Sequence, residues 1–591
     1  MYRQVLDPLA GSLYWSALCA AVPLLTMFVL LGAFRVKAQI AAVVALVLAL
    51  TLAVLVWDMP VSQALSGAAE GGFYGLFPVL WILVNALWIY RLTEITGWFA
   101  VLRRSFRTVS SDQRVQGILI AFCFGALIEA LAGFGAPVAI TAVMLVAVGV
   151  APLRAATVAL VANTAPVAFG SMAVPLITLA GVTGLPLDDL GAMAGRQTPL
   201  IAAFIPLVLV FLLDGRRGVR ETWPAAVVAG LAFALAQFVS ANYVSVEVTD
   251  IIAGVVALVT VLGFLRVWQP DAVQPDEPVS AVTETAAVGA ASPGALDATG
   301  RSGGVSEGNG SGREEGPGRG KGPGRGKGPG REEAAGREEE RLETGEGSAL
   351  MAFAPYIIIV ALFALTQIGP VKEWLAAHGV VQFTWPGLHV ESPTGQPAGA
   401  MTFKLEHLKA AGTVLLIAGL LTMALYRVGP GRAVRAYGAT LHQLRWTVVT
   451  VTSVLALAWV MNLSGQTVTL GTALAQTGTA FALFSPIVGW LGVALTGSDT
   501  SANSLFGVLQ VTAAHQTGLN PVLLAAANST GGVLGKMLSP QNLAVAAAAI
   551  GMAGSESTIF RRVLGWSLGL LAGFALIIYL QSTPVLGWMT V

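Results

Sequence analysis

Long apolar runs without charged residues recur along most of this chain. They include residues 12–34, 38–57, 73–90, 200–213, 223–241 and 251–265, and later 349–368, 410–426, 447–461, 478–495 and 563–580. Most approach or exceed the roughly 18–20 residues that a helix needs to cross a bilayer. Only 11% of the 591 residues are charged, against roughly 25% in a soluble domain. The sequence therefore predicts an all-α polytopic membrane protein, and the alternating pattern of a membrane β-barrel is missing.

Lysine and arginine are enriched in cytoplasmic loops, so their placement predicts the topology. Basic residues follow the first run (Arg35 and Lys37) and the third (Arg91 to Arg114), while acidic residues mark the loops after the second run (Asp58 and Glu70) and before the run at 251–265 (Glu247 and Asp250). This alternation predicts that both termini lie outside the cell membrane, with an even number of crossings. We expect about 12–14 transmembrane helices.

A polar segment divides the chain into two apolar halves. Residues 269–348 contain Gly-Pro-Gly-Arg-Gly-Lys repeats followed by a block of Glu and Arg, a composition that cannot form a packed core. We expect residues 1–268 and 349–591 to be two transmembrane halves joined by a disordered cytoplasmic linker. The basic residues of the linker are balanced by Glu, and the chain has a net charge of +1, so nucleic acid is not an expected partner.

A short polar pattern occurs once in each half. Its residues Asn163, Gly170, Met172 and Pro175 recur at the same spacing as Asn528, Gly535, Met537 and Pro540. Interrupted helices at corresponding places in two halves are the best sequence pointer to the binding site of a secondary transporter. We therefore expect two structurally repeated halves with broken or re-entrant helices; whether the repeat is parallel or inverted stays open.

The first half also places a carboxylate, Glu129, in an apolar run. Ionised side chains are costly inside a membrane, so such a residue faces a cavity, forms a pair, or binds a proton. It precedes Gly133, Gly135 and Pro137, which favour a break and the first turn of a new helix. The free N–H groups of such a helix start would attract an anion. A simple kink, with Glu129 bonded to a neighbour, is the alternative.

The second half has its own polar break about 30 residues before its Asn pattern. Residues 496–504 include Ser498, Asp499, Thr500, Ser501 and Asn503, which offer hydroxyls, a helix cap and a carboxylate. The alternative for this segment is a loop at the membrane surface. Lys536 follows within the second Asn pattern; it would pair with a substrate carboxylate or with Asp499, or extend to the membrane interface.

These segments resemble the lactate permease family of bacterial L-lactate and glycolate transporters. The resemblance is carried by residues 129–140, 162–170, 496–507 and 528–542, in their order and separation, and it covers the membrane part of both halves. It implies proton-coupled import of 2-hydroxymonocarboxylates, namely L-lactate, glycolate and D-lactate, across the cell membrane. It supplies no established list of binding residues.

From the residues themselves we expect the substrate site to comprise Gly133, Gly135, Pro137, Asn163, Ser498, Thr500, Ser501, Asn503, Asn528 and Lys536. Glu129 or Asp499 would carry the coupling proton. Sodium coupling through the hydroxyls and carbonyls around 498–503 is the alternative for the ion. A membrane-embedded enzyme is a second alternative, but the sequence has no His-x-x-x-His cluster, cysteine pair or ATP-binding loop. We expect no metal or organic cofactor, and the sequence does not predict the oligomeric state.

Overall fold

The computed structural model describes residues 2–34, 36–99, 101, 110, 112–133, 135–270, 349–366, 368–393, 402–552 and 554–591. The elements of the first half are β1 (Tyr2–Arg3), α1 (Leu13–Gly32), α2 (Ala38–Leu55), α3 (Val61–Tyr74), η1 (Gly75–Leu80), α4 (Trp81–Ile95), α6 (Gln113–Gly117), η2 (Ile118–Phe124), α7 (Gly125–Ala132), α8 (Ala136–Ala147), α9 (Pro152–Ala162), η3 (Val167–Phe169), α10 (Gly170–Thr183), α11 (Leu187–Ala202), α12 (Ile205–Tyr243) and α13 (Thr249–Phe264). The predicted linker lies outside the described residues, except for Gln269 and Pro270.

The second half is also mainly helical. Its elements are α16 (Ala349–Ala352), α17 (Ala354–Thr366), α18 (Gly369–His378), β2 (Val381–Thr384), β3 (Val390–Glu391), β4 (Thr402–Leu405), α19 (Ala411–Leu425), α20 (Pro430–Ser464), α21 (Gln466–Ala475), η5 (Gly478–Ala480), α22 (Phe481–Thr496), α23 (Asp499–Thr517), α24 (Pro521–Gly532), η6 (Val533–Leu538), α25 (Pro540–Ala549), α26 (Glu556–Gln581) and η7 (Gly587–Met589).

Length and composition make many of these helices able to cross a membrane. Among the described residues there are 8 such helical stretches, or up to 10 if two bent pairs each form one span, together with three shorter apolar helices. One stretch, Leu187–Tyr243, is 57 residues long, far more than the roughly 20 residues of one crossing. The prediction of an all-α polytopic membrane protein is therefore confirmed, and the number of crossings depends on how such stretches are divided.

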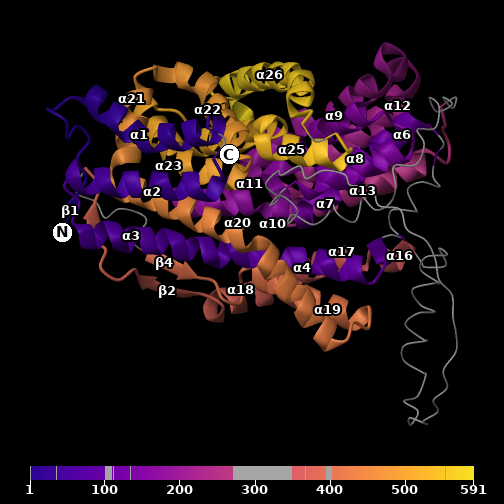
Figure 1. The fold of residues 1–591 in the computed structure, drawn as a ribbon, viewed down its shortest axis with the longest axis horizontal. Helices are drawn as coiled ribbons and strands as arrows, with labels where there is room; N and C mark the ends of the chain where they lie inside the picture. Colours follow the sequence, from indigo (N-terminus) through magenta and orange to yellow (C-terminus); the bar gives the residue numbers. More distant parts are fainter. Residues whose placement is uncertain are drawn as a thin grey trace, which may run out of the picture.

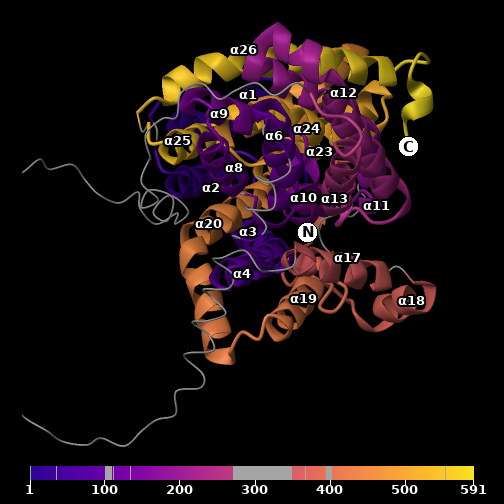
Figure 2. The ribbon, with the colours of Figure 1, turned by 90° about the vertical axis from the view of Figure 1, so that its right-hand side faces the viewer.

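The helices form a main body and an adjoining layer. Figure 1 shows α3, α4, α17 and α19 below the main body, and Figure 2 shows the long helix α20 running from that body into this layer. In agreement, α20 packs along α2, α3 and α4, and it also touches α23, while α19 lies against α4. Since α23 belongs to the site described below, α20 connects the adjoining layer to the centre of the protein.

One of two short sheets brings the N-terminal residues beside the segment that follows α18, and the other lies within that segment. Strand β1 pairs in parallel with β3, with Tyr2 opposite Val390, and β2 pairs with β4 in an antiparallel ladder. The Tyr2 hydroxyl also donates to the backbone carbonyl oxygens of Trp57 and Ser464. The first residues therefore lie beside β3, which is in the loop that follows α18.

Two acidic residues differ from the sequence prediction. Glu70 and Asp250, both expected in loops, are buried in helices α3 and α13, with 2% and 1% of their surface exposed. Counting charges between apolar runs misplaced them, because hydropathy alone does not show whether a carboxylate near an apolar run lies in a loop or in the adjoining helix.

Candidate substrate site

The break between α7 and α8 has the form that its glycines predict. Gly135 precedes α8 with a φ of +88°, a conformation that glycine adopts without the steric cost of a Cβ. Pro137 lies in the first turn of α8, where its missing N–H leaves no bond unmade. Glu129 lies one turn before the break and is buried. The interior carboxylate is therefore placed beside the start of a helix.

The second half has a corresponding break between α22 and α23. Gly497 ends α22 with a φ of +75°, and Ser498 caps α23 by accepting a hydrogen bond from the Ser501 N–H at 3.2 Å. Asp499 is the first residue of α23 and is buried. A helix N-terminus favours negative charge, so the position suits either this carboxylate or a bound anion. The surface-loop alternative for this segment is wrong.

The repeated Asn pattern forms a broken helix in each half. In the first half, Asn163 is the C-cap of α9, and Ser171, Met172 and Ala173 form a left-handed turn with φ values of 47°, 60° and 58° before α10 continues. In the second half, α24 passes into the 3₁₀ segment η6, and α25 begins at Pro540. The matching Asn and Pro residues therefore flank an irregular segment in both halves.

The matching glycines explain a second part of the repeat. A Cβ on Gly170 would lie 2.9 Å from Glu129 Oε1 on α7, and a Cβ on Gly535 would lie 2.3 Å from the Trp490 carbonyl oxygen on α22. Each half has two breaks, and each glycine lies at the break of the Asn pattern. It allows that segment to approach the helix that precedes the first break of the same half, which is α7 or α22. This shared contact supports the prediction of two structurally repeated halves.

An ion pair joins the two halves at their breaks. Lys536 Nζ, on η6, lies 2.5 Å from Glu129 Oε1, on α7, and both side chains are buried. Glu129 Oε2 has no hydrogen-bond partner among the described residues. Lys536 therefore does not extend to the membrane interface. Its partner is Glu129, one of the two carboxylates predicted to carry the coupling proton.

A cavity of about 30 Å³ lies around this pair. Its walls come from α7, α10, the α22–α23 break and η6, and its lining consists of Glu129, Val167, Gly170, Ser171, Val174, Pro175, Gly497, Ser498, Asp499, Thr500 and Lys536. Such a volume is about that of one water molecule. The structure therefore brings together the two carboxylates, the lysine and three hydroxyl groups around a space smaller than a hydroxy acid.

Asp499 is held by a serine of the second Asn pattern. The Ser529 hydroxyl donates to Asp499 Oδ2 at 2.6 Å, whereas Oδ1 has no hydrogen-bond partner among the described residues. A Cβ on Gly532 would lie 2.6 Å from that free oxygen. The carboxylate is thus packed closely on α24 and keeps one free acceptor.

Two of the predicted amides lie in a hydrogen-bond chain behind the cavity. Asn528 donates to Asn503 Oδ1 at 2.9 Å and accepts from Gln510 at 3.1 Å, while Asn503 donates to the Pro175 carbonyl oxygen at 3.1 Å. This chain ties α23 and α24 to the broken helix α10. In this conformation, Asn503 and Asn528 hold the wall of the cavity and do not line it.

The other predicted site residues, including Pro137 in the first turn of α8, are not among those that line the cavity. Gly133 is adjacent to Glu129 and Ser171, and a Cβ on Gly135 would lie 3.2 Å from Asn542 Oδ1. The Ser501 N–H is used in the cap of α23. Asn163 is buried at the end of α9, and its Oδ1 has no hydrogen-bond partner in the described part of the chain.

Ser171 and Gly170 were not among the site residues predicted from the sequence. Both line the cavity, and a Cβ on Gly133 would lie 2.6 Å from Ser171 Oγ. The available signal was the repeat itself, because Gly170 is one of its matching positions and Ser171 is the polar residue that follows it. The left-handed turn that directs this serine has no marker in residue type, since it contains no glycine.

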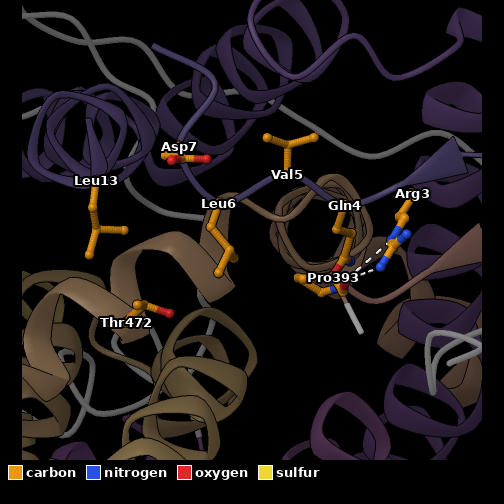
Figure 3. Close-up of a pocket in the computed structure, with 8 residues that line it drawn as sticks. All are labelled: Arg3, Gln4, Val5, Leu6, Asp7, Leu13, Pro393 and Thr472. Carbon is orange, nitrogen blue, oxygen red and sulfur yellow. Dashed lines mark hydrogen bonds between the residues drawn. The ribbon is translucent and has the colours of Figure 1, made fainter. Parts of the chain in front are cut away.

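A larger cavity lies away from these charges, near the N-terminal residues. It has a volume of about 500 Å³ and is lined by residues 3–7, Leu13, Pro393 and Thr472. Figure 3 shows Arg3 directed to Pro393, whose carbonyl oxygen accepts hydrogen bonds at 2.6 and 3.2 Å from the guanidinium. This open surface cleft contains no buried charged group, so we place the candidate site at the smaller cavity.

Within the described residues, no group of three or more His, Cys, Asp and Glu side chains could hold a metal ion.

Comparisons with known proteins match nearly the whole chain. The model of the L-lactate permease family matches residues 16–294 and 328–585. The chain is 39% identical to the glycolate permease GlcA of Escherichia coli K12 and 38% identical to the L-lactate permease of Bacillus subtilis 168, in each case over 100% of this chain and 99% of the relative. The solved structure of MtrF from Neisseria gonorrhoeae aligns with a TM-score of 0.41 and 14% identity over 86% of this chain and 82% of that one, too weakly to support an argument.

The matched relatives are permeases, so the prediction of a membrane transporter that is not an enzyme is confirmed. The family resemblance drawn from the four polar segments is confirmed as well, because the family model covers all four. The chain is a multi-pass membrane protein that belongs to the L-lactate permease family.

Proposed function

We propose that this protein is a secondary active transporter that imports L-lactate and related 2-hydroxymonocarboxylates, including glycolate and D-lactate, together with protons. The names of the relatives support the substrate class. The observation that carries the mechanism is the buried pair of Glu129 and Lys536 at the cavity between the two halves. In that pair, the Lys536 ammonium can bind the carboxylate of a substrate and the Glu129 carboxylate can bind a proton.

The pair would couple the two ligands by exchange of partners. A proton that binds Glu129 neutralises its carboxylate and leaves the Lys536 ammonium without a counter-ion. The carboxylate of the incoming hydroxy acid then takes the place of Glu129 beside Lys536. One proton and one monoanion enter together, so the buried charge is unchanged, whereas either ligand alone would leave an unpaired charge in the membrane.

The hydroxyl groups in the cavity would recognise the 2-hydroxyl of the substrate. Ser171, Ser498 and Thr500 come from both halves and face the same space. The starts of α8 and α23 add free N–H groups and the positive ends of two helix dipoles near the anion. These helix starts would depend on the residues that form them, namely Gly133, Gly135, Pro137 and Ser501. The site would be supported or extended, when it opens, by the three amides Asn163, Asn503 and Asn528.

The small volume of the cavity implies that the described conformation widens before it binds a hydroxy acid. Rigid movement of one half against the other around a central site is the usual way in which such transporters alternate their access. The ion pair and the contact of Asn503 with Pro175 both cross between the halves, so they would be remade in each cycle.

The proposed orientation keeps both termini outside the cell membrane and the segment at 269–348 in the cytoplasm. It is supported by the distribution of basic residues along the chain.

Uptake of labelled L-lactate into proteoliposomes tests the proposal. An imposed pH gradient should drive accumulation in the wild-type protein, and replacing sodium with choline at fixed pH should not change it. Glu129→Gln, which imitates the protonated acid, should retain lactate exchange and lose accumulation, whereas Lys536→Met should lose both. Sodium-dependent accumulation that ignores the pH gradient would contradict proton coupling.

A further inference from the structure

A third buried carboxylate lies near the candidate site, on a helix that the transport mechanism above does not use. Asp250 is in the first turn of α13 and is 1% exposed. The Gln237 side chain donates to its Oδ1 at 2.9 Å, and its Oδ2 has no hydrogen-bond partner among the described residues. No described Lys, Arg or His forms an ion pair with it. An ionised carboxylate in such a place is costly.

The neighbours of Asp250 do not supply a compensating charge. The elements packed against α13 are α7, η2, α10, α12 and α17. Their titratable side chains are Glu129 on α7, Cys123 on η2, Tyr356 on α17, and Tyr243 with a charged cluster at residues 214–221 on α12, while α10 carries none. None of these groups forms an ion pair with Asp250 among the described residues, and Glu129 is itself paired with Lys536.

Buried polar side chains form three hydrogen-bonded groups between Asp250 and the second carboxylate of the cavity, and the backbone joins these groups at residues 197–198 and 529–530. From Asp250 this polar chain passes through Gln237 to Thr198, whose hydroxyl donates to Gln237 at 3.0 Å. The preceding residue, Gln197, accepts from the Thr530 hydroxyl at 2.7 Å. The residue before Thr530 is Ser529, which donates to Asp499.

This polar chain crosses from the first half to the second through α13, α12, α11 and α24. Each of its members is at least nine-tenths buried, and burying polar groups of this kind is favourable only while their hydrogen bonds are made. Gln237 also donates at 3.5 Å to the carbonyl oxygen of Ala165, within the break between α9 and α10. Asp250 is therefore linked to the broken helix of one half and to the carboxylate site of the other.

We propose that Asp250 is a second proton-binding carboxylate of the transport cycle, coupled to the cavity through Gln237 and the polar chain to Asp499. This inference rests on the proton coupling in the proposed function and extends it from the Glu129–Lys536 pair to a second site. In the described conformation the coupling proton is on the free Oδ2 of Asp250 and Glu129 is ionised beside Lys536, so the cycle still carries one proton for each monoanion. When the halves move, the hydrogen bonds of the polar chain break and form again, and the proton leaves Asp250. The carboxylate becomes ionised only where water reaches it.

The test uses the full-length protein in proteoliposomes with labelled L-lactate. Asp250→Asn should lose the accumulation that a pH gradient drives, about tenfold for a gradient of about one unit, and should retain lactate counterflow within about twofold of wild type. Asp250→Glu keeps a carboxylate and should retain accumulation with a shifted pH profile. Glu247→Gln is the matched control, because this acidic residue lies three positions away and bonds to the Ser245 hydroxyl; it should behave as wild type.

The outcomes separate this inference from the proposed function. If wild type fails to accumulate lactate on a pH gradient, proton coupling itself fails, and the role of Asp250 fails with it. If wild type accumulates and Asp250→Asn does so equally, only the role of Asp250 is overturned. Loss of counterflow in both Asp250→Asn and Asp250→Glu would assign the residue to structure alone. If Asp250→Asn does not fold, an unchanged pH profile in Asp250→Glu overturns the proposal.

Discussion

Lys536 and Glu129 form an ion pair at 2.5 Å although they are 407 residues apart in the sequence. One belongs to the irregular segment η6 and the other to α7, directly before a break. Since both are buried, each neutralises a charge that would otherwise be isolated in the membrane interior.

The first prediction concerns the stability of this pair. Lys536→Met should lower the free energy of unfolding by about 3–5 kcal/mol, because it leaves a buried carboxylate without its partner. Combining it with Glu129→Gln should recover part of the loss, since no charge then remains. Thermal unfolding in detergent of the two single variants and the double variant measures the coupling. Strictly additive losses would show that the two side chains do not stabilise each other.

The second prediction concerns the close approach of α10 to Glu129. Gly170→Ala introduces a Cβ 2.9 Å from Glu129 Oε1, and the φ and ψ of Gly170 (−61° and 154°) suit alanine. The displaced carboxylate should weaken the pair with Lys536 and lower uptake at low lactate concentration about tenfold, equivalent to about 1.4 kcal/mol.

Gly569→Ala on α26 is the matched control, because no atom of the described residues lies within 4 Å of its added Cβ. It should leave uptake unchanged and, if anything, raise stability by up to about 1 kcal/mol. Equal uptake by Gly170→Ala and Gly569→Ala would refute a role for the close approach.

The third prediction separates a helix cap from a substrate contact. Ser498→Ala and Asn520→Ala each remove an N-cap, on α23 and α24 respectively, and each should cost about 1 kcal/mol of stability. Only Ser498 lines the cavity, so only its variant should also raise the KM for L-lactate, by about tenfold for one lost hydrogen bond. A KM that rises equally in both variants would show that capping alone is responsible.

The fourth prediction concerns an ion cluster away from the cavity. Arg114 is 2% exposed and pairs with Asp112 at 2.7 Å, Asp214 at 3.0 Å and Glu221 at 2.6 Å. Arg114→Gln should lower stability by about 3–5 kcal/mol, because it leaves buried Asp112 unpaired. Arg217→Gln removes an exposed pair with Glu221 on the same helix and should cost only about 0.3–0.5 kcal/mol. Thermal unfolding of the two variants measures this difference between buried and exposed pairing. Similar unfolding midpoints would contradict the larger contribution of the buried pair.

The membrane fold and the location of the breaks could be predicted from the sequence because they depend on local chemistry. Apolar runs, positive φ at glycines such as Gly135 and Gly497, and proline in a first turn are properties of short segments. The repeat predicted that Glu129, Asp499 and Lys536 lie at one site, because interrupted helices in the two halves of a transporter form a shared binding site.

The details that the sequence did not predict depend on contacts between distant segments. The choice of Glu129 as the partner of Lys536 is set by the packing that positions η6, mainly against α22 and α26, and neither local sequence encodes it. Asn528 matches Asn163 in the repeat, yet its amide is used by Gln510 and Asn503. Asp250 was misplaced because its burial is produced by the packing of α13 against α7 and the preceding helix α12, which the hydropathy of one segment does not show.

The left-handed turn at Ser171, Met172 and Ala173 has an energetic consequence for the transport cycle. Residues other than glycine cost about 1–2 kcal/mol each in this conformation, and surrounding packing must maintain it. All three are buried, so the turn persists only while α10 is enclosed by its neighbours. When the halves separate, this backbone can relax to an ordinary helix and release that free energy at the wall of the cavity. A substrate or inhibitor that favours the relaxed turn would therefore gain affinity from the protein backbone as well as from its own contacts.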